Sequence, residues 1–417
     1  MNKIRNQKLI LFILTLFLVA SFSVTYAFWA SSVQGASSIG SGVLEVGLWV
    51  PTGYVGVTED GAGDMITLNE IGSGSYPLSG KYIQMSDINW NNQAFTPIGL
   101  NSAGVFSGEY HGNGFSISNI NINLTHTNTG TSSYAGLFYR NSGLISRVSL
   151  INAAITLSKS STGISGDDLY LGGIAGQNTG SIVYSYTTGT VSGTMTRPYT
   201  ASNGNSIFTY VFAGGIAGSN SGNIHNSYSQ ATINSVADAS SDKNNSSVYA
   251  YGYAGGLVGR NESAGSVLNT YATGTVTAEA VADNTGNRKQ QAYAYSYAGG
   301  LVGHNNSGTV SYSFATGTVQ ARTQTTTSGT AVRYFGYING LGTSISSYRL
   351  STQSISGFII TPGANGTSVQ NTADSTVVST TQANLRLESY ITSNLLWDAN
   401  DWIFDTTYYP RLKRNKY

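Results

Sequence analysis

A nine-residue unit recurs through the middle of the chain and constrains what the chain can fold into. It reads Tyr-Ala-Gly-Gly-Leu-Val-Gly-His-Asn at 297–305, and close variants stand at 170–178, 212–220 and 253–261. Shorter, altered copies occupy 134–141 and 334–339. Self-similarity at a fixed period is the signature of one structural unit used again, so the repeat decides the architecture before local propensities do.

Two positions mark every full copy, the second glycine of the pair and the closing asparagine. The marked glycines are 42, 41 and 44 residues apart. The runs between glycines have the length of strands, and glycine and asparagine tolerate the left-handed backbone that corners use. We therefore expect an all-β fold, a β-solenoid with stacked coils and an asparagine side-chain amide ladder along one corner. The number of coils per repeat stays open. The marked residues are Gly173, Asn178, Gly215, Asn220, Gly256, Asn261, Gly300 and Asn305.

Composition excludes several functional classes. Charged residues make up 9% of the 417 residues, far below the usual quarter, and the net charge is +1. A chain that binds nucleic acid needs a clustered basic face, so we expect no nucleic-acid partner. The chain has no Cys, which excludes disulfides and thiolate metal sites. Exported Gram-positive surface proteins are typically free of cysteine in this way.

The ends of the chain differ from its middle. Residues 1–27 have a basic start, a 12-residue apolar run from Leu9 to Ala20, and a small residue, Ala27, at the expected cleavage point. We interpret them as a secretory signal peptide, the alternative being an uncleaved membrane anchor. Residues 28–63 are expected to form a spacer with short strands, 64–133 an N-terminal cap with entry coils, 134–350 the repeats, and 351–417 a C-terminal cap.

Polar segments of unequal length separate the repeats. They span 192–211, 234–248 and 278–291, and such insertions usually form loops on one face of a solenoid. Aromatic residues crowd just after two of them. Since Tyr297, Gly299 and Leu301 alternate onto one strand face, we expect the repeat aromatics to stack in the core. The alternative is an exposed aromatic ladder, and the candidate surface-binding residues are Tyr249, Tyr251, Tyr293 and Tyr295.

Three segments resemble a known family. The Gly-Gly-Leu-Val-Gly and Gly-Gly-Ile-Ala-Gly units resemble the GLUG-repeat proteins, which are exported bacterial surface proteins. Trp90 with 97–99 and 106–117 resembles the segment that precedes such repeats, and 397–413 resembles their closing segment. The resemblance covers about residues 80–415 and implies a right-handed parallel β-helix with a role in adhesion. It implies no catalytic residues. Residues 25–32 also resemble the signal region of TasA/camelysin-like exported proteins.

Catalytic chemistry has few candidates. The sequence has no zinc-protease, P-loop or nucleophile-elbow motif. Asp167 and Asp168 are the one adjacent acidic pair within the repeats, and we interpret them as a solvated loop pair rather than a catalytic dyad or a Ca²⁺ site. His225 and His304 stand at variable repeat positions, where we expect histidines that face solvent. We therefore predict no metal and no cofactor.

Three functions compete. The favoured one is a secreted, non-enzymatic, adhesin-like protein at the cell surface of a Gram-positive bacterium, which binds a host or matrix protein or a glycan. A polysaccharide-active enzyme on the same fold is the second. A structural wall or matrix component that self-associates is the third. The oligomeric state and the mode of retention at the cell surface stay open.

Overall fold

The computed structural model describes residues 49–101, 104–127, 130–200, 204–244, 246–285, 292–325, 329–359, 366–370 and 377–413. The expected signal peptide, its anchor alternative, the TasA-like segment and most of the 28–63 spacer lie outside these residues. Residues 50–417 form one compact unit. None of the helices in the described ranges combines the length and the apolar character needed to cross a bilayer.

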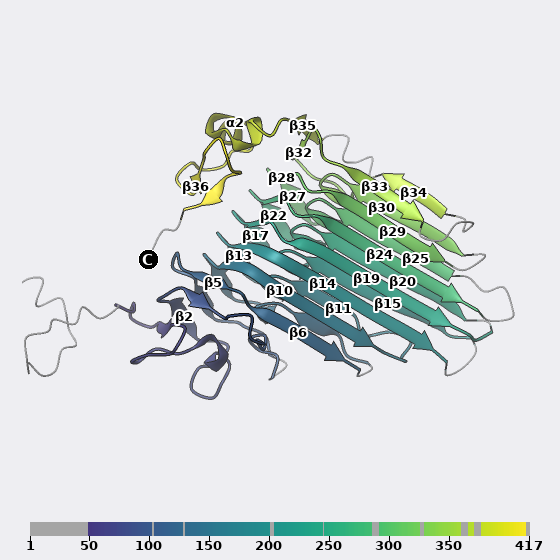
Figure 1. Cartoon of the computed structure of the whole chain (residues 1–417), viewed down its shortest axis with the longest axis horizontal. Coiled ribbons are helices and arrows are strands. Elements are labelled where there is room, and N and C mark those ends of the chain that lie inside the picture. Colours follow the sequence, from purple (N-terminus) through teal and green to yellow (C-terminus); the bar gives the residue numbers. More distant parts are fainter. Residues whose placement is uncertain are drawn as a thin grey trace, which may run out of the picture. The chain divides into compact units, whose positions relative to one another are not determined.

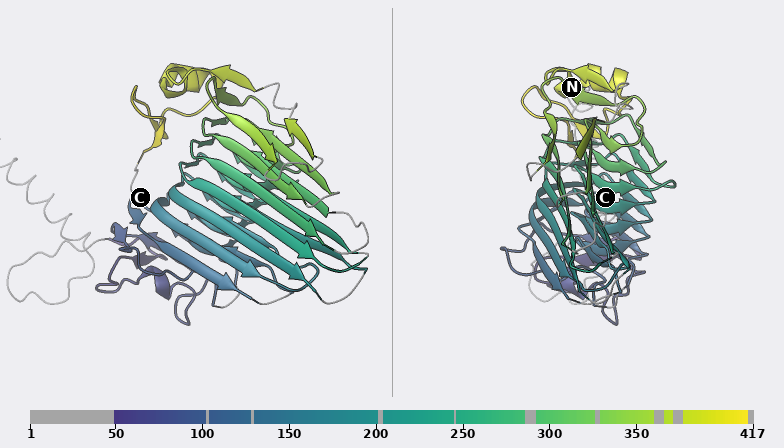
Figure 2. Two further views of the ribbon diagram at one scale, coloured as in Figure 1. Left: turned by 45° about the vertical axis from the view of Figure 1, so that its right-hand side comes forward. Right: turned by 90° about the vertical axis from the view of Figure 1, so that its right-hand side faces the viewer.

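Each repeat makes one coil of a parallel β-helix, which answers a question that the sequence leaves open. The chain passes through four sheets in order to complete a coil, and the next repeat begins again above the first (Figures 1 and 2). All the strand pairs that join described coils are parallel, and about half of the residues are in strands. The prediction of an all-β solenoid is therefore confirmed, while its handedness stays a prediction.

Sheets 1 and 2 form the first half of each coil. Sheet 1 contains β7 (Ser133–Ala135), β11 (Leu169–Gly172), β15 (Ser206–Gly214), β20 (Ser247–Gly255), β25 (Ala292–Gly299), β30 (Thr330–Gly336) and β34 (Gly366–Gln370). Sheet 2 contains β8 (Phe138–Asn141), β12 (Ala175–Asn178), β16 (Ala217–Asn220), β21 (Val258–Asn261), β26 (Val302–Asn305) and β31 (Asn339–Leu341). We number coils 1 to 6 from β7 to β30.

Sheets 3 and 4 form the second half and include strands from the N-terminal region. Sheet 3 contains β1 (Val55–Val57), β2 (Lys81–Gln84), β4 (Glu109–His111), β9 (Leu144–Ser146), β13 (Ser181–Val183), β17 (Asn223–His225), β22 (Ser266–Leu268) and β27 (Thr309–Ser311). Sheet 4 contains β3 (Ile88–Asn89), β5 (Ser116–Ser118), β6 (Asn121–His126), β10 (Ser149–Ser160), β14 (Tyr186–Tyr199), β18 (Tyr228–Ser229), β19 (Thr232–Ser241), β23 (Tyr271–Ala272), β24 (Val276–Asn284), β28 (Phe314–Ala315), β29 (Val319–Thr325), β32 (Tyr348–Leu350), β33 (Ile355–Ile359) and β35 (Val378–Thr380).

The repeat asparagines form a continuous amide ladder at the corner after sheet 2. The side-chain Nδ2 of Asn141 donates to Oδ1 of Asn178 at 2.8 Å. Asn178 donates to Asn220 at 2.8 Å, Asn220 to Asn261 at 2.8 Å, and Asn261 to Asn305 at 3.0 Å. All five side chains are buried. Because a buried amide without a partner is costly, each asparagine stabilises the coils above and below it.

At the corner between sheets 1 and 2, glycine is required because there is no room for a side chain, and not because the backbone is left-handed. This corrects our expectation for the corner. A Cβ atom on Gly215 would lie 2.3 Å from the carbonyl oxygen of Gly256, and one on Gly256 would lie 2.2 Å from that of Gly300. Neither glycine has a positive φ. The corner packs the backbones of successive coils so closely that any side chain would collide with the coil above.

The left-handed corner lies elsewhere, between sheets 3 and 4. One residue per coil has a positive φ of 45–56° there, and none of these residues is a glycine. A single left-handed residue breaks the alternation of faces along the strand, so the side chains that follow it change sides. The six corner residues are Arg147, Tyr184, Asn226, Asn269, Tyr312 and Ser346.

The polar segments between repeats are mainly strands, so their prediction as loops is wrong. They extend β14, β19 and β24, and the chain returns in β15, β20 and β25. Many inward positions of β19, β20 and β24 are small, as at Ala237, Ala250 and Ala280, and many outward positions are polar or aromatic. Alternating small and polar residues therefore fold into two long sheets around a thin core.

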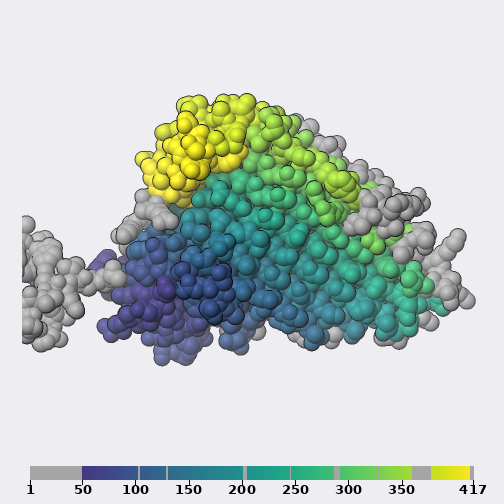
Figure 3. Space-filling view, viewed as in Figure 1, coloured from purple at the N-terminus to yellow at the C-terminus, as the bar shows by residue number. Residues whose placement is uncertain are grey.

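The C-terminal segment adds to the stack and also covers its side. It contains η3 (Asn384–Arg386), α2 (Glu388–Asn394) and the antiparallel pair β36 (Trp402–Ile403) and β37 (Arg411–Leu412). Trp397 and Trp402 stack on each other at 4.4 Å and lie against a second aromatic column at the start of sheet 4, in which Tyr228, Tyr271 and Phe314 stack at 4.7 Å. Figure 3 shows this segment in yellow beside the coils that it contacts.

The amide ladder predicts a site-specific loss of stability. Asn220→Ala removes one member and leaves the buried amides of Asn178 and Asn261 each short of a partner. We expect the free energy of unfolding to fall by about 2–3 kcal/mol, measured by chemical denaturation followed by circular dichroism. Asn234→Ala, at an exposed position on β19, is the matched control and should change stability by less than about 0.5 kcal/mol. Equal effects of the two substitutions would contradict the ladder.

Candidate functional site

Nine aromatic rings form a regular array on the outer face of sheet 1, which we call the aromatic face. Each of the strands β15, β20 and β25 contributes one row of three rings. Rings of successive rows stack with centroids 4.5–5.0 Å apart. Five pairs of neighbouring rings within the rows lie 6.2–6.5 Å apart. The rows are Phe208, Tyr210 and Phe212; Tyr249, Tyr251 and Tyr253; Tyr293, Tyr295 and Tyr297.

The array packs as a cluster separate from the main core. Its innermost column, Phe212, Tyr253 and Tyr297, is buried and stacked as expected, whereas the rings of the outer two columns are half-buried. On β20 the inward positions are Val248, Ala250 and Ala254, which belong to the core. The tyrosines between them point to the other side and pack with each other as a separate cluster. Leu301 does not share the face of Tyr297, because the close-packed glycine corner between them turns the chain into the next sheet. Tyr271 and Phe314 also lie outside the main core, because the left-handed corner precedes them.

The rings present their edges, not their faces, to the surroundings. Interplanar angles are 6–16° along the columns and 1–10° within the rows, so each row is a nearly flat layer stacked on the next. The face of each ring in the middle row is therefore covered by rings of coils 3 and 5. Burial raises the pKa of Tyr251, Tyr253 and Tyr297, so these side chains stay hydroxyl groups at neutral pH.

Polar side chains from sheet 2 border the innermost column. The guanidinium of Arg260 lies 6.0 Å from the ring of Phe212 and 3.3 Å from the carboxylate of Glu262. His304 stacks beside Tyr297 at 5.4 Å and beside Tyr253 at 6.0 Å. Its expected place in solvent is therefore wrong: the imidazole is half-buried, and burial together with the charge of Arg260 lowers its pKa to about 4. His225 is also half-buried, with Nε2 3.0 Å from the hydroxyl of Ser266.

Asp167 is part of a buried ion pair, which corrects its interpretation as a solvated loop residue. Its carboxylate contacts the guanidinium of Arg197, and both side chains are fully buried. Arg197 also donates to the carbonyl oxygen of Gly163 at 2.8 Å and to the hydroxyl of Thr209 at 3.2 Å. Since a buried ion pair needs both partners, Asp167 has a structural role and is not placed to act as a free catalytic acid.

Asp168 differs from Asp167. Its carboxylate is half-buried, accepts a hydrogen bond from the hydroxyl of Tyr170 at 3.3 Å, and has a pKa raised by burial. It directly precedes Leu169, which pairs with Val211 on β15. Burial raises the pKa of Tyr210 and the charge of Asp168 adds to it, so Asp168 stands beside the first row of the aromatic face. The two acidic residues thus have different roles and do not form a dyad.

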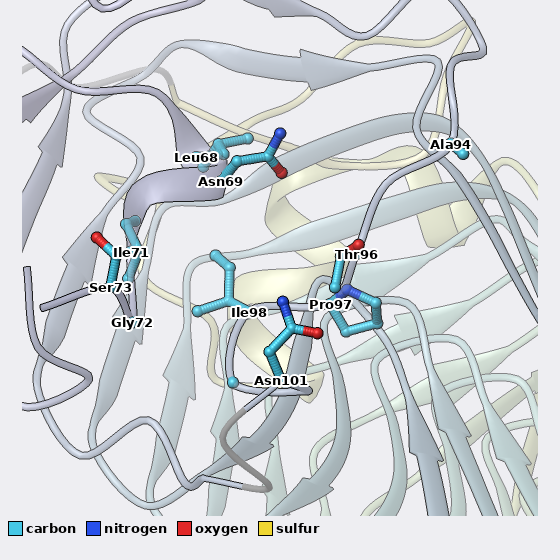
Figure 4. A pocket seen from close by; sticks show the side chains of 11 residues that line it. Leu68, Asn69, Ile71, Gly72, Ser73, Ala94, Thr96, Pro97, Ile98 and Asn101 are labelled. Carbon is cyan, nitrogen blue, oxygen red and sulfur yellow. The ribbon is translucent and has the colours of Figure 1, made fainter.

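Two hollows lie elsewhere on the described surface. A pocket of about 340 Å³ lies between η1 (Leu68–Glu70) and residues 94–101 (Figure 4), and no charged side chain contributes to its lining. A shallow depression on the outer face of sheet 4 is lined by Glu279, Gln320, Arg322 and Phe358. Within the described ranges, no three His, Cys, Asp or Glu side chains are grouped so that they could hold a metal ion.

Comparison with known families identifies the repeat. The model of the GLUG motif matches residues 250–277 and 294–320. These stretches run from sheet 1 of coils 4 and 5, through the glycine corner and the asparagine ladder, to the start of sheet 4. The chain is a GLUG-repeat protein. Each GLUG unit thus includes most of the sheet 1 strand, the glycine pair, the asparagine and the sheet 3 strand, while the aromatic residues at 249 and 293 lie just outside the matched stretches.

Other comparisons add little. A search among curated proteins finds no match. One solved structure, described as a putative immunoglobulin A1 protease from Bacteroides ovatus, is 20% identical and has a TM-score of 0.44. The alignment covers 80% of this chain and 86% of that protein. A likeness of this degree has no bearing on the activity of the GLUG-repeat chain.

The structure brings the four candidate tyrosines together. Tyr249, Tyr251, Tyr293 and Tyr295 form a two-by-two block of the aromatic face. Sequence reasoning missed Phe208 and Tyr210, which complete their columns, because residues 192–211 were interpreted as a loop. The signal was present: Phe208, Tyr210 and Phe212 alternate with Ile207, Thr209 and Val211, as expected of a strand with two different faces.

The buried imidazole of His304 predicts a pH-dependent stability. Its pKa is about 4 in the folded chain and near 6.5 when unfolded, so between these values only the unfolded state binds the proton. Stability is therefore lost as the pH falls from 7 towards 4. We expect His304→Gln, which copies Gln177 of coil 2, to reduce this loss by about 1–3 kcal/mol, measured by denaturation at pH 7 and pH 4.5. An unchanged difference between the two pH values would contradict the assignment.

Proposed function

We propose that this GLUG-repeat protein is an exported, non-enzymatic, adhesin-like protein of a Gram-positive cell surface, and that its aromatic face is the contact surface. The observation that carries the proposal is a flat array of nine aromatic rings on the outer face of sheet 1, in which the six rings of the outer two columns are only half-buried and lie outside the main core. A protein that only needed stability would gain more from rings inside its core, since burial of aromatic area is a main stabilising contribution.

The chemistry of the face supports recognition of a macromolecular surface. Tyrosine offers a large, rigid contact area and a hydroxyl group at little cost in conformational entropy. The outward positions of β15, β20 and β25 hold no charged side chain. Interface centres are typically rich in tyrosine and poor in lysine and glutamate, with charges at the rim. Arg260 and Asp168 stand at the margin of the array, where rim charges are expected.

The edge-on geometry favours a protein surface over a glycan. Sugar rings usually bind tyrosine by lying on the ring face, and the stacked columns leave ring faces open only where a column ends. Edges and hydroxyl groups instead suit a flat partner that offers hydrogen bonds and apolar atoms together. The expected partners are therefore host or matrix proteins first and glycans second.

The enzymatic alternative receives no support from a specific site. Asp167 is held in a buried ion pair with Arg197. Asp238, Asp283 and Glu279 form an acidic group on the outer face of sheet 4. Burial raises the pKa of Asp238, and the charges of Asp283 and Glu279 add to this increase. Glu279 of this group also lines the shallow depression on the outer face of sheet 4, together with Gln320, Arg322 and Phe358.

A binding assay with paired variants tests the proposal. The expected mature chain, residues 28–417, is applied to cells, to immobilised matrix proteins and to a glycan array. We expect retention on cells or matrix proteins, and at least a tenfold loss in the double variant Tyr251→Ser with Tyr295→Ser, because central aromatic residues dominate interface energies. Asn234→Ser with Thr277→Ser, on the opposite sheet, is the control. Retention that is equal in both double variants would place the contact elsewhere, and retention nowhere would remove the adhesin function.

A further inference from the structure

The spacing of the aromatic face matches one kind of partner closely. Its rows repeat every 4.5–5.0 Å, which is the distance between neighbouring strands of any β-sheet. A partner stays in contact with every row only if it presents groups at the same interval. Another β-sheet face, with its strands aligned to those of sheet 1, meets this requirement across all three rows.

The chemistry of the face is complementary to itself. Tyrosine hydroxyls both donate and accept hydrogen bonds, so tyrosine can pair with tyrosine. A two-fold symmetric interface brings each surface onto an identical one, and a charged centre would then repel its copy. The outward side chains of β15, β20 and β25 carry no charge, and Arg260, whose charge reaches Tyr253, lies at the inner edge of the array and not at its centre. This face can therefore meet a copy of itself without bringing like charges together.

The size of sheet 1 suits a weak dimer. Its strands from β7 to β30 contain between three and nine residues each. At about 3.3 Å per residue and 4.8 Å per strand, the sheet has a flat area of about 600 Å². Two such faces together would remove about 1,200 Å² from solvent, which is the lower end of the range for specific interfaces. An interface of this size is consistent with reversible association between molecules on neighbouring cells.

From these three observations we infer that the aromatic face binds the same face of a second copy of this chain. The inference rests on the proposed function and names the partner of its contact surface: adhesion is homophilic. The two-fold axis lies in the plane of the interface and passes close to Tyr251, the centre of the array. Tyr251 then meets Tyr251 of the second copy.

Sedimentation velocity on residues 28–417 tests the pairing. We expect a reversible dimer with a dissociation constant on the order of 10 µM. Tyr251→Lys and Tyr251→Glu should each weaken the dimer at least tenfold, because like charges meet at the axis, and an equal mixture of the two variants should restore it. Asn234→Lys, on the outer face of sheet 4, should leave the dimer unchanged. Tyr251→Phe keeps the ring, as Phe208 and Phe212 do, and should weaken the dimer several-fold without loss of fold.

The outcomes separate this inference from the proposed function. A chain that stays monomeric at about 200 µM overturns the pairing, and so does a dimer that responds equally to Tyr251→Lys and Asn234→Lys. Failure of the charge-reversed mixture to dimerise, with both variants folded by circular dichroism, also overturns it. If the monomeric chain is still retained on matrix proteins through Tyr251 and Tyr295, the adhesin function stands and only the homophilic partner is wrong.

Discussion

Backbone hydrogen bonds between successive coils hold each residue directly above its sequence equivalent in the coil below. The other features of the molecule depend on this register. With one coil per repeat, a residue type that recurs every 41–44 positions becomes a continuous column. Asparagine then forms a buried amide ladder, and glycine allows the backbones of successive coils to approach closely. Neither arrangement exists in a single repeat, so stability is shared between neighbours rather than stored within a unit.

The same register produces the aromatic face. Tyrosines that would be scattered on an irregular surface are aligned into columns, where each ring covers the faces of its neighbours and turns its edge outward. The charged margin formed by Arg260 and Asp168 stays outside the array. A second aromatic column, centred on Tyr271, is instead covered by Trp397 and Trp402 of the C-terminal segment. Of these two groups of rings, only the aromatic face on sheet 1 remains available to a partner among the described residues.

The sequence predicts the coil and its ladder because fixed residue types at fixed offsets carry that information directly. The sequence does not predict which way the side chains point after a single left-handed residue has broken their alternation along the strand. The left-handed residue before Tyr271 is Asn269 and the one before Phe314 is Tyr312, so no shared residue type marks this corner. The strands that extend each coil were also missed, because their inward residues are small and their segments look polar on average. Asp167 gave no sign of burial, since its partner Arg197 lies 30 residues away in another strand.

Disulfide trapping tests the register most directly, because the chain contains no cysteine. Asn234 of coil 3 is paired with Thr277 of coil 4 on the outer face of sheet 4. Their Cα atoms are expected to be about 4.8 Å apart, within reach of a disulfide, whereas Asn234 and Glu279 are offset by two residues and about 8 Å apart. The account predicts that the cysteine pair 234/277 forms an intramolecular disulfide readily and that the pair 234/279 does not. Efficient closure of 234/279, or no closure of 234/277 in a folded chain, would contradict the stacking of one coil per repeat.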